Sequence, residues 1–188
     1  MSHVQSAQAA APVRYCSRAM RSADLVLVRR WLDEPHVAQW WPDGEKQAQS
    51  IAEHLSELSM RCLILRIDGR DVGYLQVYDP HHEPCIAPDG TEISHPYRDQ
   101  PPGTRGIDLF IGEATWLGRG HGPRLVARVL RDLFSAGAPC VVTDPDPTNS
   151  NSIAAFGKAG FRALETRDTA WGHVLLMRCD NPDPATAK

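Results

Sequence analysis

Residues 105–135 read RGIDLFIGEATWLGRGHGPRLVARVLRDLFS, a pattern that predicts a strand, a glycine-rich turn and a helix in succession. Apolar residues recur every four positions along the helix, 123–135, and Pro123 suits its first turn, where a missing N–H costs little. The glycines at 118–122 allow a tight bend, so that the N–H groups at the helix start point outward. The positive end of the helix dipole favours a phosphate at such a place.

The spacing of these glycines matches neither of two common phosphate-binding motifs. Gly118, Gly120 and Gly122 follow the pattern G-x-G-x-G, without the Gly-Lys-Ser/Thr ending of a P-loop or the spacing of a dinucleotide-binding fingerprint. Taken alone, such a turn is more often a plain connection between a strand and a helix. A phosphate site therefore needs support from other parts of the chain.

The strand before the turn, 105–111, carries an acidic residue among apolar ones. Alternation places Asp108 and Phe110 on the face opposite Ile107 and Leu109. Because a buried, unpaired carboxylate is costly, Asp108 needs a partner. A carboxylate projecting from such a strand can orient an amine and take its proton, although a structural salt bridge would satisfy the same need.

Composition narrows the class of protein. The length of 188 residues suits one domain, and 42% hydrophobic with 23% charged residues is ordinary for a globular chain. A net charge of −3 disfavours a nucleic-acid binder. No apolar run approaches the roughly 18 residues of a membrane span, and the N-terminus lacks the pattern of a signal peptide. We therefore expect a cytoplasmic protein that binds neither nucleic acid nor membrane.

The cysteines and histidines give no strong metal signal. Five cysteines are scattered without a CxxC motif, so that neither a disulfide framework nor a zinc site is expected. His81, His82 and Cys85 lie close together, but no second half-site with suitable spacing accompanies them. We expect a solvated proline-rich loop at this place and no bound metal.

The remaining pattern predicts a single α/β (α+β) domain, in which helices flank a mixed central β-sheet. We expect residues 14–180 to form it, between flexible tails at 1–13 and 181–188. Segment 79–104 contains six prolines and no apolar period, which predicts a long loop. The other expected elements are strands at 15–20, 62–67, 72–78, 140–143, 162–166 and 173–178, and helices starting at Ser22 or Asp24, at 45–58 and at 150–159.

A second segment completes a family pattern. Residues 143–149 read TDPDPTN and residues 155–161 read AFGKAGF. Together with the glycine turn they resemble the GNAT acetyltransferases over roughly residues 15–178, which implies the GNAT fold and acetyl-CoA as co-substrate. In that family the N–H groups of the turn hold the pyrophosphate, and the second segment packs beside the pantetheine. The resemblance places these residues at acetyl-CoA: Leu109, Phe110, Ile111, Arg119, Gly120, His121, Gly122, Pro123, Arg124, Asn149, Phe156 and Lys158.

Two positions depart from the family pattern. Leu117 stands where the turn usually has Gln or Arg, but backbone N–H groups carry most of the phosphate binding, so we expect it to survive. Arg119 and Arg124 either add charge near the phosphates or are solvated cations of the helix face. Phe156 replaces the Tyr that protonates the departing CoA thiolate in many members, and water or another hydroxyl would have to serve instead.

Within this family the chain is similar to the aminoglycoside 6′-N-acetyltransferases. The matching segments are WL at 31–32, HVAQWW at 36–41, VGYLQVY at 72–78, RGID at 105–108, LGRG at 117–120 and TDP at 143–145. The resemblance implies that Asp108 is the general base, that Asp144 binds acceptor amines and that Trp41 forms a wall of the acceptor site. The expected substrate-binding residues are Trp40, Trp41, Gln76, Tyr78, Asp108 and Asp144.

Several residues of this expected acceptor site also fit simpler roles. Asp144 and Asp146 lie between prolines just past a strand, where they suit a cation but equally suit turn capping. The acidic residues of the long loop favour a polycationic substrate or are merely solvated. They are Asp79, Glu83, Asp89, Glu92 and Asp99.

Three hypotheses follow. The first is an acetyl-CoA-dependent N-acetyltransferase, monomer or homodimer, that acts by direct attack on an amine of a cationic small molecule, above all the 6′-amine of an aminoglycoside antibiotic. The second is a siderophore-pathway acyltransferase acting on a hydroxylated lysine-type amine, a group that carries His where this chain has Asp108. The third is a non-catalytic acetyl-CoA-binding domain, which Phe156 keeps open. Asp108 favours the first.

Overall fold

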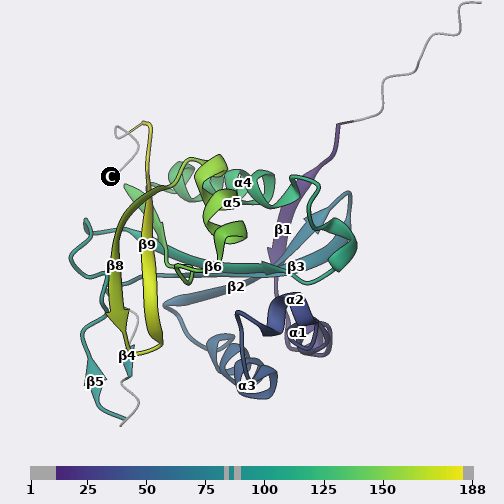
Figure 1. The fold of residues 1–188 in the computed structure, drawn as a ribbon, viewed down its shortest axis with the longest axis horizontal. Helices are drawn as coiled ribbons and strands as arrows, with labels where there is room; N and C mark the ends of the chain where they lie inside the picture. Colours follow the sequence, from purple (N-terminus) through teal and green to yellow (C-terminus); the bar gives the residue numbers. More distant parts are fainter. Residues whose placement is uncertain (1–11, 83–84, 87–89, 184–188) are drawn as a thin grey trace, which may run out of the picture.

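A seven-stranded sheet forms the centre of the protein (Figure 1). A computed structural model describes residues 12–82, 85–86 and 90–183. The strand order is β1-β2-β3-β6-β7-β9-β8. The bounds are β1 Tyr15–Ala19, β2 Met60–Ile67, β3 Arg70–Tyr78, β6 Arg105–Ile111, β7 Cys140–Thr143, β8 Arg162–Thr169 and β9 Gly172–Asp180. This arrangement confirms the expected single domain with a mixed sheet.

Helices cover both faces of the sheet (Figure 1). One face carries α1 Leu25–Leu32, α2 Pro35–Ala38 and α3 Gly44–His54, and the other carries α4 His121–Ser135 and α5 Ser150–Ala159. Two 3-10 turns, η1 Ser22–Asp24 and η2 Ala114–Trp116, and the short strands β4 Cys85–Ile86 and β5 Glu92–Ile93 complete the elements. Each face has its own apolar core, because the strands alternate their side chains between the two layers.

The parallel strands β6 and β7 pair only at their beginnings. Arg105 lies opposite Val141 and Gly106 opposite Val142, and no further pairing joins these two strands in the described residues. Past Gly106, β6 therefore continues along β3 alone. The strands separate and leave a gap in the sheet, with Asp108 on one side of it.

Some expected boundaries were wrong. The helix predicted at 45–58 ends at His54, and Leu58, which was expected on its apolar face, is fully exposed because the chain turns here to enter β2 at Met60. The helix expected from Pro123 begins two residues earlier, because Gly120 adopts the left-handed conformation that starts it.

The segment predicted as one long loop, 79–104, is only partly irregular. It contributes β4 and β5. Tyr97 from this segment is fully buried in a small apolar cluster with Val142 of β7 and Leu176 of β9. Asn181, the first residue of the expected C-terminal tail, is also part of the fold, since its side chain donates to the carbonyl of Ala138 at 3.1 Å. Most of the two expected tails lies outside the described residues.

Candidate active site

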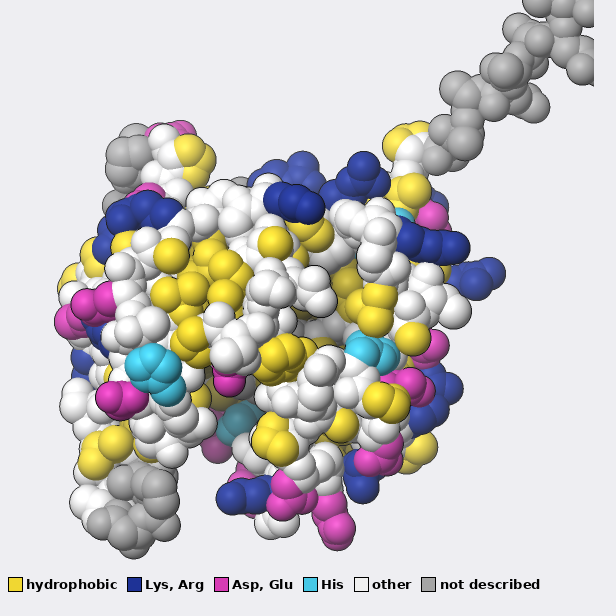
Figure 2. All heavy atoms as spheres, viewed as in Figure 1, with side chains coloured by type: hydrophobic (Ala, Val, Ile, Leu, Met, Phe, Trp, Pro, Cys, Tyr) yellow, Lys and Arg dark blue, Asp and Glu magenta, His cyan; other side chains and the backbone are white. Residues whose placement is uncertain are grey.

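Two carboxyl groups meet where β6 and β7 separate. Asp108 lies in β6 two residues past Gly106, and Asp144 follows directly after the end of β7. Their side chains hydrogen-bond to each other and are partly buried. We call Asp108 and Asp144 the carboxyl pair. Figure 2 shows a hollow between the β8–β9 side of the molecule and the side formed by α1–α3, with acidic side-chain atoms inside it.

Both members of the carboxyl pair have a raised affinity for a proton. Burial raises the pKa of Asp108 well above its ordinary value, and the charge of Asp144 raises this pKa further. Burial also raises the pKa of Asp144, but hydrogen bonds donated to its carboxylate oppose that change. The pair therefore holds a proton more tightly than two ordinary carboxyl groups do. A carboxylate with a raised pKa is a stronger base than an ordinary one.

Aromatic residues surround Asp144. Its Oδ2 accepts hydrogen bonds from the Tyr97 hydroxyl at 2.7 Å and from the Trp171 indole Nε1 at 2.8 Å. Trp171 lies in the turn between β8 and β9 and is half exposed, whereas Tyr97 is fully buried. His95 contacts both rings, with centroid distances of 5.1 and 5.7 Å. Burial lowers the pKa of His95 to about 4, so this imidazole is neutral at pH 7.

Sequence reasoning missed Tyr97, His95 and Trp171. They lie in two irregular segments that are far apart in the chain, and no periodicity connects them. The sequence offered one weak signal. Large aromatic and imidazole side chains stand in polar, proline-rich or turn-forming segments, where a solvated loop has no structural requirement for them.

A glutamine holds the other member of the carboxyl pair. Gln76 lies directly opposite Asp108 on β3, and its Nε2 donates to Asp108 Oδ2 at 2.8 Å. Tyr78, which was expected in the acceptor site, is instead buried with its ring over Gly106 and 5.5 Å from the His95 ring. Tyr78 thus packs against His95 of the aromatic group and also lines a cavity at the end of β3.

The tryptophan pair divides between core and surface, because adjacent side chains point in different directions. Trp41 packs edge-on against Phe110, with centroids 5.2 Å apart, and against Tyr74 at 6.3 Å. Trp40 is more exposed, at 37%. Because Phe110 and Asp108 share one face of β6, Trp41 lies on the same side of the sheet as the carboxyl pair.

Backbone groups of β6 face the gap between the strands. The N–H of Gly112 donates to Val72, so alternate residues of β6 bond to β3 and the polar groups of Leu109 and Ile111 point the other way. The Ile111 carbonyl accepts a hydrogen bond from His36 Nε2 at 2.9 Å. The other backbone groups facing the gap can pair with an amide-containing chain such as pantetheine.

The glycine turn lies at the far end of β6, before α4. Gly118 and Gly120 have φ of +70° and +73°, which glycine adopts without strain. Gly120 is the N-cap of α4, and no side chain among the described residues caps this helix start. The 15 residues of α4 align their peptide dipoles behind the first turn. This helix start is therefore suited to bind an anion.

The side chains around the turn have different roles. His121 is buried, with its Nδ1 2.9 Å from the Tyr15 hydroxyl and its ring against Trp116. Burial lowers the pKa of His121, so its side chain is neutral and structural, although its backbone N–H belongs to the helix start. Arg119 and Arg124 are exposed, and the described residues give neither an ion pair.

Three residues expected at acetyl-CoA lie in α5 or at its start. Asn149 caps the helix, because its Oδ1 accepts from the N–H of Ser152 at 3.0 Å. Phe156 packs into the core against Phe161, with centroids 5.2 Å apart, and is only 5% exposed. Its phenyl group therefore neither donates a proton nor lies free to contact a thiol here. Lys158 is exposed on the outer face of α5.

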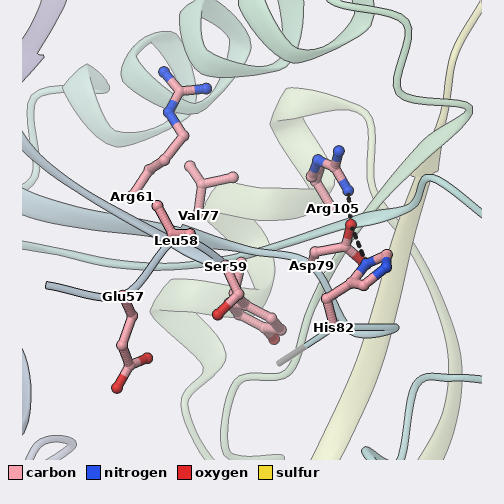
Figure 3. Close-up of a pocket in the computed structure, with 9 residues that line it drawn as sticks. Glu57, Leu58, Ser59, Arg61, Val77, Asp79, His82 and Arg105 are labelled. Carbon is pink, nitrogen blue, oxygen red and sulfur yellow. Dashed lines mark hydrogen bonds and ion pairs between the residues drawn. The ribbon is translucent and has the colours of Figure 1, made fainter. Parts of the chain in front are cut away.

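The acidic residues of the 79–104 segment are partly neutralised. A cavity of about 700 Å³ lies at the end of β3, and Figure 3 shows Asp79 at its edge with interactions to Arg105 and His82. Asp99 pairs with Arg167 of β8. Glu83 and Asp89 lie outside the described residues. Among the described acids, the carboxyl pair is therefore the main candidate for binding a cationic group near β6.

Metal ligands and membrane helices were not expected. Within the described ranges, no group of three or more His, Cys, Asp or Glu side chains is placed to hold a metal ion. No helix in the same part of the chain is long and apolar enough to cross a membrane.

Comparison with known proteins places this geometry in a family. Residues 21–169 match the family described as "Acetyltransferase (GNAT) domain". The chain therefore belongs to the GNAT acetyltransferases, as the glycine turn and the AFGKAGF segment predicted.

Individual relatives carry more specific names. The chain is 30% identical over 168 residues to aminoglycoside N(6′)-acetyltransferase type 1 of Klebsiella pneumoniae, covering 85% of this chain and 80% of that protein. It is 27% identical over 176 residues to the lysine N-acyltransferase MbtK of Mycobacterium tuberculosis, covering 91% and 80%. The solved structure of AAC(6′)-Ib with ribostamycin and coenzyme A matches with a TM-score of 0.75 and 27% identity, over 88% of this chain and 93% of that one.

Proposed function

We propose that this protein transfers an acetyl group from acetyl-CoA to an amine of a cationic small molecule, and that the acceptor is the 6′-amine of an aminoglycoside. The carboxyl pair at the separation of β6 and β7 carries the proposal, because it offers negative charge and a base beside the gap that leads to the glycine turn. The similarity to aminoglycoside N(6′)-acetyltransferases at 30% identity supports the same acceptor. The expected cytoplasmic location fits the use of acetyl-CoA.

The acceptor enters as an ammonium and must lose a proton before it can attack. Asp144, whose carboxylate form accepts hydrogen bonds from Tyr97 and Trp171, provides the charge that attracts the ammonium. Binding of a cation lowers the affinity of the pair for a proton, because a positive charge stabilises both carboxylates in their ionised form. Asp108 then takes a proton from the ammonium, directly or through water, and leaves a neutral amine.

Acetyl-CoA supplies the thioester that the neutral amine attacks. The start of α4 would hold its pyrophosphate, and the backbone of Leu109 and Ile111 would orient its pantetheine chain. The departing thiolate needs little help, because a free thiol has a pKa of about 8.5. A buried Phe156 is therefore compatible with turnover, because the proton that the attacking nitrogen loses as the amide forms can reach the thiolate through water or another hydroxyl.

The lysine N-acyltransferase similarity favours a second candidate, acylation of a hydroxylated lysine-type amine. The family resemblance implies a His at the base position in that group, where this chain has Asp108. The aminoglycoside proposal is therefore the stronger of the two.

An acceptor screen tests the proposal. The purified chain is incubated with acetyl-CoA and each acceptor, and release of the CoA thiol is measured. We expect turnover with aminoglycosides that carry a 6′-amine and none with matched compounds that carry a 6′-hydroxyl. Turnover only with hydroxylated lysine would support the second candidate, and absence of thiol release with every aminoglycoside would refute the first.

A further inference from the structure

A buried chain of hydrogen bonds leads from β2 to the carboxyl pair. The single proton of the Tyr74 hydroxyl has two acceptors within reach, Gln76 Oε1 at 3.1 Å and Cys62 Sγ at 3.2 Å. Gln76 Nε2 donates in turn to Asp108 Oδ2 at 2.8 Å. Tyr74 is fully buried, two residues before Gln76 on the same face of β3. Its hydroxyl therefore contacts Asp108 only through the Gln76 amide.

We propose that Tyr74 is a positioning residue, whose hydroxyl fixes the Gln76 amide with its NH₂ towards Asp108 and so favours the ionised, proton-accepting form of that carboxyl. The role of Asp108 as the base rests on the proposed function, whereas the orientation of the amide does not. Tyr74 thereby counteracts the burial and the Asp144 charge, both of which favour the protonated form.

The two ends of a glutamine amide have different hydrogen-bonding capacities. An NH₂ group turned towards Asp108 donates to a carboxylate, whereas a carbonyl turned the same way requires a protonated carboxyl as its donor. Burial raises the pKa of the Tyr74 hydroxyl far above its ordinary value, so the hydroxyl keeps its proton and can donate to Gln76. A hydroxyl donor selects the carbonyl end of the amide, and the NH₂ end must then face Asp108.

Asp144, Tyr74 and Tyr97 are ionisable groups that interact with Asp108. The charge of Asp144 raises the pKa of Asp108, and the two tyrosine hydroxyls lie close enough for the Asp108 charge to act on them. Burial raises the pKa of both tyrosines, so neither changes charge near neutrality. A shift in the titration of Asp108 therefore reports on the carboxyl pair and on the hydrogen bonds that it accepts.

The test is Tyr74→Phe, which keeps the ring against Trp41 and Phe110 and removes the hydroxyl. The Gln76 amide is then free to turn its carbonyl towards Asp108. We expect the pH at which Asp108 loses its proton to rise by about half a unit, and by about one unit in Gln76→Met, where a hydrogen bond to a charged group is lost outright. The acidic limb of kcat/KM should move upward by the same amounts.

Two readouts separate this proposal from the proposed function. Carbon-13 NMR of labelled aspartate, assigned with Asp108→Asn, follows the carboxyl titration without any acceptor. The pH profile of kcat/KM uses whichever acceptor the screen identifies. A failed screen with a shifted NMR titration would refute the aminoglycoside proposal and leave the role of Tyr74 supported.

The control is Cys62→Ala, which removes the other contact of the same hydroxyl in the same buried region. A general loosening of the core would move the titration in this variant as well, whereas our proposal predicts no upward shift. The double variant Tyr74→Phe/Gln76→Met should shift no further than Gln76→Met alone. An unmoved titration in folded Tyr74→Phe, or additive shifts in the double variant, would overturn the proposal.

Discussion

The two ends of β6 are built in different ways. At the end next to α4, the anion site consists of backbone N–H groups from one continuous segment, with glycine φ values that place them. In the middle of β6, the carboxyl pair depends on side chains from β3, β6, the 79–104 segment and the turn between β8 and β9. We call the part of β6 next to α4 the donor end, because it would bind acetyl-CoA, and the part around the carboxyl pair the acceptor end, because it would bind the amine. The donor end depends on local backbone conformation, whereas the acceptor end depends on tertiary contacts. A substitution at one end should therefore change the binding or turnover of one substrate and leave the affinity for the other nearly unchanged.

Asp108→Asn is expected to give the largest difference between the effect on acceptor turnover and the effect on acetyl-CoA binding. The substitution keeps the shape of the side chain and removes the base, so we expect kcat/KM for the acceptor to fall by about 10²–10⁴-fold. The dissociation constant of acetyl-CoA, measured by calorimetry, should stay nearly unchanged, because the helix start is untouched. Asp168→Asn, an exposed residue of β8, is the matched control. A wild-type rate in Asp108→Asn would exclude this residue as the base.

The same variant should be more stable than the wild type at neutral pH. Burial raises the pKa of Asp108, so above pH 4 the folded protein binds more protons than the unfolded chain, and its free energy of unfolding falls as pH rises. Asp108→Asn removes this loss and should gain about 1–3 kcal/mol at pH 7, or a Tm higher by about 2–4 °C per kcal/mol. The gain should disappear below about pH 4, where both states of the wild type are protonated. Equal Tm values across this pH range would contradict the raised pKa.

The next largest effect on substrate binding is expected for Gly120→Ala, at the donor end. A Cβ at this position meets no atom within 4 Å, so the cost comes from the φ of +73°, at about 1–2 kcal/mol. Any relaxation of φ redirects the N–H groups at the start of α4, and we expect acetyl-CoA binding to weaken by about tenfold with little change in acceptor KM. Gly69→Ala imposes the same penalty at φ +80° in the β2–β3 turn. This control should lose stability while binding acetyl-CoA normally.

The same contrast explains how much could be predicted from the sequence. The strand, the glycine turn, α4 and α5 were predictable because their signals lie within a few residues: alternation around Asp108, the glycines before Pro123 and the Gly160 that ends α5. The residues matching the family also identified both members of the carboxyl pair. Tyr97 and Trp171 were not predictable, because only the folded sheet brings the two irregular segments to Asp144.

The boundary errors have a related cause. Leu58 fits the helical period of 45–58, yet the chain leaves the helix at His54 because β2 must begin at Met60 on the neighbouring layer. Phe156 likewise lies in the segment that matches the family, but its ring completes the core around Phe161. Periodicity and motif identify a residue's element, while its direction depends on the packing around it.

Trp171→Phe tests how much the indole hydrogen bond to Asp144 contributes to acceptor binding. The phenyl ring retains an aromatic wall, but the hydrogen bond from Nε1 to Asp144 is lost. Because Tyr97 still donates to the same oxygen, we expect a modest effect: acceptor KM should change by about two- to fivefold with acetyl-CoA affinity unchanged. His173→Gln, exposed on the same hairpin, is the control. An effect on acetyl-CoA alone would show that Trp171 belongs to the donor end.

The smallest effect is expected from Arg124→Gln at the donor end. Arg124 is exposed in the first turns of α4, so its charge acts on a bound phosphate through solvent. We expect acetyl-CoA affinity to fall by about two- to threefold at low salt, and the difference from the wild type to shrink at high salt as screening increases. Arg131→Gln makes the same charge change on the same helix, about 10 Å further along, and should have a smaller effect. Because backbone groups are retained in both variants, a loss of tenfold or more in Arg124→Gln would mean that side-chain charge, and not the helix start, provides most of the phosphate binding.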